Sequence, residues 1–164
     1  MELEIGTADY LKIDDVELAD LLTQVYVAGG FTSADEAVAL FEPVAVRERG
    51  VVIGARDKSN LKLAGIVIVV PPESPARRLA KNNEAEIHLL GVSPQYRRHG
   101  LGRMLIEAAI TQAKNNGYSK IILWTQISMK SAQRLYEATG FVYLSTLTRN
   151  GRDFKVYELV LRTE

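Results

Sequence analysis

The sequence predicts an α/β (α+β) protein in which strands and helices alternate along the chain before a closing β-hairpin. Runs of β-branched residues, as in Leu61 to Val70, alternate with segments whose apolar residues recur at helical spacing, as in Leu101 to Asn116. Asn150-Gly151, a pair that favours a two-residue hairpin turn, lies between the last two expected strands. The length of 164 residues and the 47% of hydrophobic residues predict one domain over residues 1–164.

The first part of the chain is expected to form a strand and two helices. The strand covers Leu3 to Gly6, and the first helix runs from about Asp14 to Val27. The apolar face of this helix is expected to consist of Val16, Ala19, Leu22 and Tyr26. Ser33 can cap the second helix, with Glu36 at the capping-box position, and this helix is expected to run to Pro43.

Two strands follow and are expected to form a hairpin. They cover Gly50 to Arg56 and Leu61 to Val70, and the turn-forming residues Asp57 to Asn60 separate them. Pro71 to Pro75 ends the second strand. The polar connection then continues to about Asn83, which is longer than a hairpin needs, so we expect it to lie near the substrate.

The second half is expected to form two helices among four strands. In chain order these are the strand Glu84 to Val92, the helix Leu101 to Asn116, the strand Lys120 to Gln126, the helix Ser128 to Thr139, and the hairpin strands Phe141 to Thr148 and Asp153 to Leu161. Gly117 and Gly140 provide the stop signals for the two helices.

Composition argues against several classes of protein. No apolar run reaches the roughly 18 residues of a membrane helix, and Met1 to Glu4 does not resemble a signal peptide, so we expect a cytoplasmic protein without a membrane partner. Twenty basic and twenty acidic residues give a net charge of zero, which disfavours a nucleic-acid partner and a DNA-binding regulator. The absence of cysteine excludes disulfides, thiolate metal sites and a cysteine acyl-enzyme.

The segment Glu86 to Arg103 is typical of a strand that leads through a glycine turn into a helix. Beyond Gly102 the helical spacing from Leu101 continues through Met104, Leu105, Ala108 and Ala109. The unpaired amides of a first helical turn and the positive end of its dipole attract an anion, and glycines let a pyrophosphate approach the backbone. The segment matches neither the P-loop nor the dinucleotide-binding pattern.

Two motifs resemble those of the GNAT superfamily of N-acetyltransferases. Arg97, Gly100 and Gly102 match the acyl-CoA-binding pattern Arg/Gln-x-x-Gly-x-Gly/Ala, and Ala132 to Phe141 matches the pattern Ala-x-x-Leu-Tyr-x-x-x-Gly-Phe. The resemblance is detailed from Glu84 to Leu161. It implies a GNAT-like fold, which is a mixed central sheet splayed around the acyl-CoA and flanked by helices.

The resemblance also implies the cofactor and its contacts. Acetyl-CoA is the expected cofactor, with CoA as the product and no metal. The expected cofactor-binding residues lie at the end of one strand and in the following turn: Leu90, Val92, Arg97, Arg98, His99, Gly100, Leu101, Gly102 and Arg103. Leu90 and Val92 are expected to act through their backbone groups. Met129 stands where many relatives carry an asparagine, and the effect of this difference on the contact to the pantetheine arm stays open.

Acetyl transfer to an amine requires a base and benefits from an acid. An aliphatic ammonium of pKa about 10.4 loses its proton at a cost of roughly 4 to 5 kcal/mol at neutral pH. By resemblance Glu86 is the base, directly or through a water, with Glu84 as the second candidate. His88 shares a strand face with Glu86 and could relay a proton. Tyr136 occupies the position of the tyrosine that protonates the leaving thiolate.

The implied function is transfer of the acetyl group of acetyl-CoA to a primary amine by direct attack in a ternary complex. The acceptor is a small-molecule or peptide amine that the sequence does not identify, and Tyr26 to Thr32 and Pro71 to Asn83 are expected to form its walls. Arg77 and Arg78 are expected to be solvated rather than to contact a substrate. The alternative function is a non-catalytic acyl-CoA-binding sensor or partner module. Homodimers are common among the proteins that the chain resembles.

Overall fold

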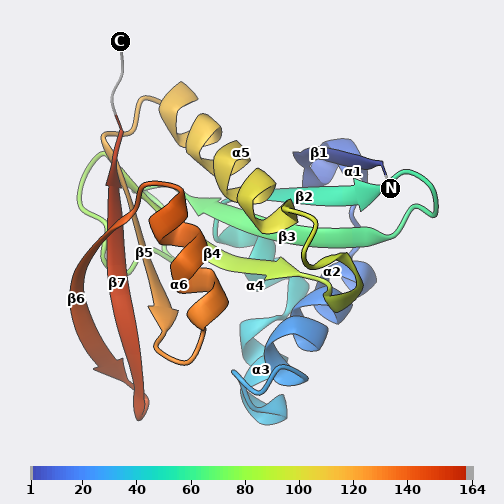
Figure 1. Ribbon diagram of the computed structural model, residues 1–164, viewed down its shortest axis with the longest axis horizontal. Coiled ribbons are helices and arrows are strands. Elements are labelled where there is room, and N and C mark those ends of the chain that lie inside the picture. Colours follow the sequence, from blue (N-terminus) through green and yellow to red (C-terminus); the bar gives the residue numbers. More distant parts are fainter. Residues whose placement is uncertain (1, 162–164) are drawn as a thin grey trace.

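A mixed sheet of seven strands forms the centre of the computed structural model, which describes residues 2–161 (Figure 1). The strand order is β1-β2-β3-β4-β5-β7-β6; β4 and β5 pair in parallel and all other neighbours pair antiparallel. This confirms the predicted fold class. The strands are β1 (Leu3–Thr7), β2 (Val51–Asp57), β3 (Leu63–Val70), β4 (Glu84–Val92), β5 (Lys120–Gln126), β6 (Val142–Arg149) and β7 (Arg152–Val160).

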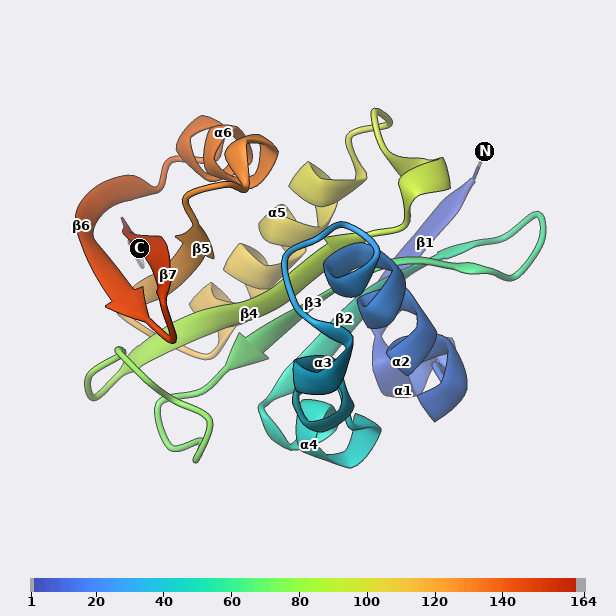
Figure 2. The same cartoon turned by 90° about the horizontal axis from the view of Figure 1, so that it is seen from below.

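Helices cover both faces of the sheet (Figure 2). The first face carries α1 (Ala8–Leu11), α2 (Asp15–Leu22), the π-helix η1 (Thr23–Val27), α3 (Ala34–Leu40) and α4 (Pro43–Glu48). The opposite face carries α5 (Leu101–Asn115) and α6 (Lys130–Ala138), and the short 3₁₀ turn η2 (Pro94–Tyr96) precedes α5. Within residues 2–161, no helix combines the length and the apolar character that a membrane crossing requires.

Strand β3 lies between the two layers of helices, and every one of its residues is buried. Leu63, Ile66, Ile68 and Val70 pack in the cluster formed with α1 to α4, whereas Ala64, Val67 and Val69 pack in the cluster formed with α5. Because successive side chains of a strand point to opposite faces, a strand covered on both sides needs apolar residues at every position. This requirement explains the uninterrupted apolar run that indicated the strand.

The first expected helix differs from the structure in three ways. The short helix α1 precedes it and was not expected, and the α-helix ends at Leu22, where the π-helix begins. The expected apolar face is also wrong at Val16, which is 71% exposed. The buried face consists of Leu18, Leu21, Leu22 and Val25, whose spacing forms a continuous apolar stripe that Val16 does not share.

The second expected helix begins correctly and ends differently. Ser33 caps α3, and Glu36 completes the capping box as predicted. Pro43, which was expected to end this helix, instead starts α4, because a proline at the first helical position loses no helical hydrogen bond. The carboxylate of Glu42 accepts hydrogen bonds from the next free amides, those of Val44 and Ala45.

The second half follows the prediction closely. Strand β4 has the predicted bounds, and α5 ends one residue earlier than expected. Met104 was placed on the apolar face of α5 but is 40% exposed, because Leu105 and Ala109 take the buried positions. The hairpin turn forms at Asn150 and Gly151, where φ is +53° and +73°, as a type I′ turn requires.

Candidate active site

Strands β4 and β5 pair only at their first residues and then separate. The pairing joins Glu84–Glu86 to Lys120–Ile122. On its other side β4 contains a bulge, because Ile68 pairs with His88 and Ile66 pairs with Gly91, which leaves two residues of β4 opposite one residue of β3. A bulge bends the strand that carries it. The separation opens the centre of the sheet along the second half of β4.

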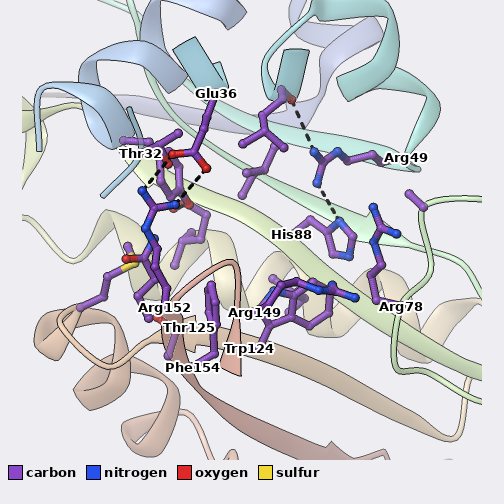
Figure 3. A pocket seen from close by; sticks show the side chains of 18 of the residues that line it. Thr32, Glu36, Arg49, Arg78, His88, Trp124, Thr125, Arg149, Arg152 and Phe154 are labelled. Carbon is purple, nitrogen blue, oxygen red and sulfur yellow. Dashed lines mark hydrogen bonds and ion pairs between the residues drawn. The ribbon is translucent and has the colours of Figure 1, made fainter. Parts of the chain in front are cut away.

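A pocket of about 560 Å³ lies at this separation (Figure 3). Its volume is within the range of small-molecule sites. The helical layer, the connection before β4, strands β4 and β5, helix α6 and the closing hairpin all contribute to the wall: Tyr26, Thr32, Glu36, Leu40, Phe41, Ala45, Arg49, Ala76, Arg78, Ile87, His88, Leu89, Leu90, Trp124, Thr125, Gln126, Met129, Tyr136, Arg149, Asn150, Arg152 and Phe154. Both segments that were expected to form acceptor walls contribute. Arg78 is exposed, as expected, and it also lines the pocket.

Glu86 lies behind the pocket wall and has no exposed surface. Its carboxylate accepts hydrogen bonds from the backbone amides of Arg78 (2.9 Å), Leu79 (2.6 Å) and Ala80 (2.7 Å). It also contacts Nε2 of His88 at 2.8 Å. Glu86 therefore holds the connection before β4 against the strand and fixes the orientation of the histidine.

The environment of Glu86 keeps its carboxylate ionised. Burial by itself raises the pKa of Glu86, because it penalises the charged form. The hydrogen bonds from His88 and from the amides of Ala80, Leu79 and Arg78 together have the larger opposite effect. The pKa of Glu86 is therefore lower than the usual value for a glutamate.

His88 does line the pocket, and both of its ring nitrogens have partners. Nη1 of Arg49 lies 3.0 Å from Nδ1. A guanidinium can only donate hydrogen bonds, so Nδ1 accepts this bond and Nε2–H donates to Glu86. The ring also contacts Trp124 of β5 edge-on, with centroids 4.9 Å apart. His88 thus joins the two strands where their backbones have separated.

The surroundings of His88 favour its neutral form. Burial lowers the pKa of His88, and the positive charges of Arg49 and Arg78 lower it further. The bond to Glu86 acts in the opposite direction, but the net pKa is below the usual value. At neutral pH the imidazole is therefore unprotonated and able to accept a proton.

Tyr136 lies on α6 with its ring packed among Phe141 and Tyr157. Its hydroxyl forms no hydrogen bond within residues 2–161, yet in that part of the chain no fully buried polar side-chain atom lacks a partner. The hydroxyl therefore opens into the pocket that Tyr136 lines. Burial raises the pKa of Tyr136 well above its usual range, so the phenol carries its proton at neutral pH.

The turn before α5 has the geometry of an anion site. Gly100 caps the helix with φ +74°, and a Cβ added there would meet no atom within 4 Å. Arg98 is also left-handed, with φ +66°, and left-handed residues in a turn can direct successive amides toward one point. The helix of fifteen residues adds the positive end of its dipole. His99 and Leu101 complete the turn.

Other predicted cofactor residues have partners within the protein. Nε of Arg97 donates to the carbonyl of Val92 at 3.3 Å, and Arg103 pairs with Glu107 at 2.8 Å. The hydroxyl of Tyr26 donates to the carbonyl of Leu90 at 2.8 Å, which leaves that oxygen a second lone pair. The structure also gives Gly102 a packing role, because a Cβ there would lie 3.1 Å from Cδ2 of Leu135 on α6.

Of the two remaining sequence candidates, Glu84 lies outside the pocket wall and Met129 belongs to it. Glu84 does not line the pocket, and its carboxylate accepts a hydrogen bond from the amide of Lys81. Met129 lines the pocket and precedes α6 without a side-chain capping bond. Over the described part of the chain, no three acidic or histidine side chains are close enough to hold a metal ion.

Sequence reasoning missed several wall residues, among them four charged side chains: Glu36, Arg49, Arg149 and Arg152. Arg49 follows α4, whereas Arg149 and Arg152 flank the hairpin turn. None of these arginines belongs to a motif, and they come from segments about a hundred residues apart. Only the hairpin signal at Asn150 could have drawn attention to its charged neighbours.

Comparison with known proteins gives a family match over most of the chain. The model of the acetyltransferase (GNAT) family matches residues 16–141. N-acetyltransferase family 8 member 3 of Rattus norvegicus is 31% identical over 84 residues, which are 51% of this chain and 36% of that protein. N-alpha-acetyltransferase 30 of Homo sapiens is 39% identical over 79 residues, 46% of this chain and 22% of that protein. The match thus spans well under half the length of these relatives.

Solved structures of acetyltransferases share the fold. A Bacillus subtilis acetyltransferase in complex with CoA has a TM-score of 0.72 and 23% identity, with 98% of this chain and 100% of that chain covered. The ribosomal-protein-S18-alanine N-acetyltransferase of Escherichia coli has a TM-score of 0.73 and 21% identity, with 99% and 96% covered. At these identities the likeness shows the fold alone.

The contacts of Glu86 predict a specific loss of stability. Glu86→Gln replaces one acceptor oxygen by an NH2 group that faces amide donors, so we expect the free energy of unfolding to fall by about 2 kcal/mol. Urea unfolding followed by circular dichroism measures this change. Glu84→Gln on the same strand, where one amide is accepted at a partly exposed position, should cost less than half as much.

The difference in the free energy of unfolding between the wild type and Glu86→Gln should depend on pH. The pKa of Glu86 is lower in the folded protein than in the unfolded chain, so its stabilisation is complete above the unfolded pKa of about 4.5 and is lost as the pH falls through the folded pKa. The stability gap between the wild type and Glu86→Gln should therefore narrow below about pH 4.5. A gap that widens on acidification would contradict the described hydrogen bonds.

Proposed function

Because this chain belongs to the acetyltransferase (GNAT) family, we propose that it transfers the acetyl group of acetyl-CoA to a primary amine by direct attack in a ternary complex. The observation that carries the proposal is the pocket at the separation of β4 and β5. The pocket wall contains a neutral imidazole and a protonated phenol, and β4 leads through η2 to the turn before α5 that we propose as the anion site.

The proposed cofactor contacts use backbone groups and fixed positive charge. The backbone of Leu90 and Val92 lies beyond the last β4–β5 pair and would hold the pantetheine arm. The amides from Arg98 to Gly102 would hold the pyrophosphate, with the guanidinium groups of Arg97, Arg98 and Arg103 nearby. Acetyl-CoA supplies the acetyl group as an activated thioester. Backbone amides near Leu90 to Val92 would stabilise the negative charge on the acetyl oxygen.

We propose that Glu86 provides the base function through His88. Glu86 has no exposed surface, so direct contact with an acceptor would require residues 78–80 to leave its carboxylate. His88 lines the pocket in its neutral form, and its Nδ1 can take the proton of the ammonium once the guanidinium of Arg49, which donates to this nitrogen, has moved away. The carboxylate of Glu86 then stabilises the imidazolium through the bond to Nε2. Glu84 has no comparable path into the pocket.

Tyr136 is the proposed acid. Its phenol carries a proton at neutral pH and opens into the pocket. It can donate this proton to the leaving thiolate, whose pKa near 8.5 makes the assistance useful but modest. A chain that binds CoA tightly without turnover would instead fit the role of a sensor. Thiol release with an amine panel separates the two functions, and the protein has no cysteine of its own to disturb this assay.

The cofactor assignment predicts the effect of charge at Gly100. Asn and Asp both tolerate its left-handed conformation and have nearly the same shape. Gly100→Asp should weaken CoA binding by about tenfold or more relative to Gly100→Asn, because it places a negative charge beside the pyrophosphate. Calorimetry with CoA measures the difference. Equal affinities of the two variants for CoA would show that the pyrophosphate does not bind at this turn.

The acid assignment predicts a loss in kcat. Tyr136→Phe should lower kcat by about tenfold or more while KM for acetyl-CoA changes little, since only the proton donor is removed. Tyr143→Phe, at an exposed position outside the pocket, is the control and should keep the wild-type kcat. A Tyr136→Phe enzyme with unchanged kcat would make this tyrosine a packing residue only.

The base assignment predicts a dependence on the pKa of the acceptor. At pH 7 Glu86→Gln should lower kcat/KM most for an aliphatic amine of pKa about 10.4, and less for an α-amine of pKa about 8, because the first arrives almost fully protonated. The defect should shrink as the pH rises toward the amine pKa. Glu84→Gln should show no such trend. If the loss of kcat/KM in Glu86→Gln is constant between about pH 7 and pH 10, Glu86 only holds the neighbouring residues in place and takes no part in proton removal.

A further inference from the structure

The pocket concentrates positive charge in a protein that has no net charge. Four arginines line it, namely Arg49, Arg78, Arg149 and Arg152, and the only carboxylate in the described wall is that of Glu36. Glu36 and Arg152 pair through two contacts of 2.9 and 3.1 Å. The bond from Arg152 and those from Ser33 hold the pKa of Glu36 at about 2, so this pair stays intact at neutral pH.

The other three guanidinium groups have no carboxylate partner in the part of the chain that the structure describes. In the view of Figure 3, Arg49, Arg78 and Arg149 lie on the His88 side of the pocket, whereas Glu36 and Arg152 lie on the other side. Arg49 is partly buried, and burial together with the charge of Arg78 lowers the pKa of Arg49. The positive charges of Arg49 and Arg78 thus lie close enough to affect each other, at a pocket where Arg49 is partly buried and Arg78 and Arg149 are exposed.

Such an arrangement costs free energy unless an anion compensates the charges. Planar guanidinium groups match the oxygens of a carboxylate or a phosphate, to which they donate paired hydrogen bonds. The arginines of the turn before α5 form a separate group, because none of Arg97, Arg98 and Arg103 lines this pocket. The charge beside His88 is therefore distinct from the charge assigned to the cofactor phosphates.

We propose that the acceptor is a small amine that also carries an anionic oxygen group, a carboxylate or a phosphate, which Arg49, Arg78 and Arg149 bind while its amino group faces His88. This inference rests on the proposed acetyl transfer and names the substrate class of the same site. The pocket volume of about 560 Å³ suits a small molecule. An anion that engages Arg49 also draws this side chain from Nδ1 of His88, the nitrogen that the base role requires.

A panel of matched acceptors tests the inference in the full-length protein with acetyl-CoA. L-phenylalanine is compared with phenethylamine, L-lysine with cadaverine, and glycine with aminomethylphosphonate. We expect kcat/KM to be at least about tenfold higher for the amino acids or for the phosphonate than for the amines without an anionic group. A preference for glycine over aminomethylphosphonate would indicate a carboxylate site, and the opposite preference would indicate a phosphate site. Equal or better use of phenethylamine, cadaverine or a lysine-rich peptide would overturn the proposal.

Substitutions locate the anion site. Arg78→Gln and Arg149→Gln should each raise KM for the best anionic acceptor by about fivefold or more, with KM for acetyl-CoA unchanged, and Arg78→Lys should restore part of the loss. Arg77→Gln is the matched control, because Arg77 is the exposed neighbour of Arg78 and does not line the pocket. An effect of Arg77→Gln equal to that of Arg78→Gln would contradict the assigned site.

A binding measurement separates this inference from the proposed function. N-acetyl-L-phenylalanine, a product that cannot be acetylated again, is titrated into the wild type and Arg149→Gln by calorimetry. If no amine releases thiol from acetyl-CoA but this anion binds the wild type at least about fivefold more tightly than the variant, the transfer function fails and the anion site stands. If amines without an anionic group are acetylated and the two affinities are equal, the function stands and the anion site fails.

Discussion

A carboxylate without exposed surface must be hydrogen bonded, and Glu86 meets this requirement with three consecutive backbone amides and one imidazole. These bonds determine where the connection before β4 lies. They therefore place Arg78 in the pocket wall, and they fix which nitrogen of His88 faces the pocket. Removal of this one carboxylate would leave three amides and an N–H group without an acceptor. The geometry of the pocket wall around His88 depends on this buried charge.

The separation of β4 from β5 imposes a second constraint, because backbone groups that leave a ladder need other partners. The protein meets part of this need itself. The hydroxyl of Tyr26 donates to the carbonyl of Leu90, and Nε of Arg97 donates to the carbonyl of Val92. Beyond these contacts the edge of β4 is suited to a ligand with amide groups of its own. This strand edge in the centre of the sheet is the surface at which we propose that the cofactor binds.

Local signals explain how much of the molecule could be predicted. The capping box at Ser33, the turn at Asn150 and the bounds of β4 depend on neighbours within a few residues, and the structure has them as expected. Pro43 gave an ambiguous signal, since a proline can follow one helix or begin another. The partners of Glu86 lie in an irregular segment, and strand periodicity predicts a shared face with His88 but not three loop amides. The arginine cluster arises from distant segments and has no local pattern.

The charges around His88 connect the two sides of the proposed chemistry. Arg49 and Arg78 lower the pKa of His88 and so keep it unprotonated while the pocket holds no anion. An acceptor with an anionic group reduces this effect, because its negative charge offsets the two guanidinium groups. The proton affinity of His88 then rises when the acceptor brings the proton that must be removed. With the carboxylate of Glu86 on the other nitrogen, the imidazole would become a stronger base in the occupied pocket than in the free protein. The same arginines would therefore select the acceptor and adjust the base to it.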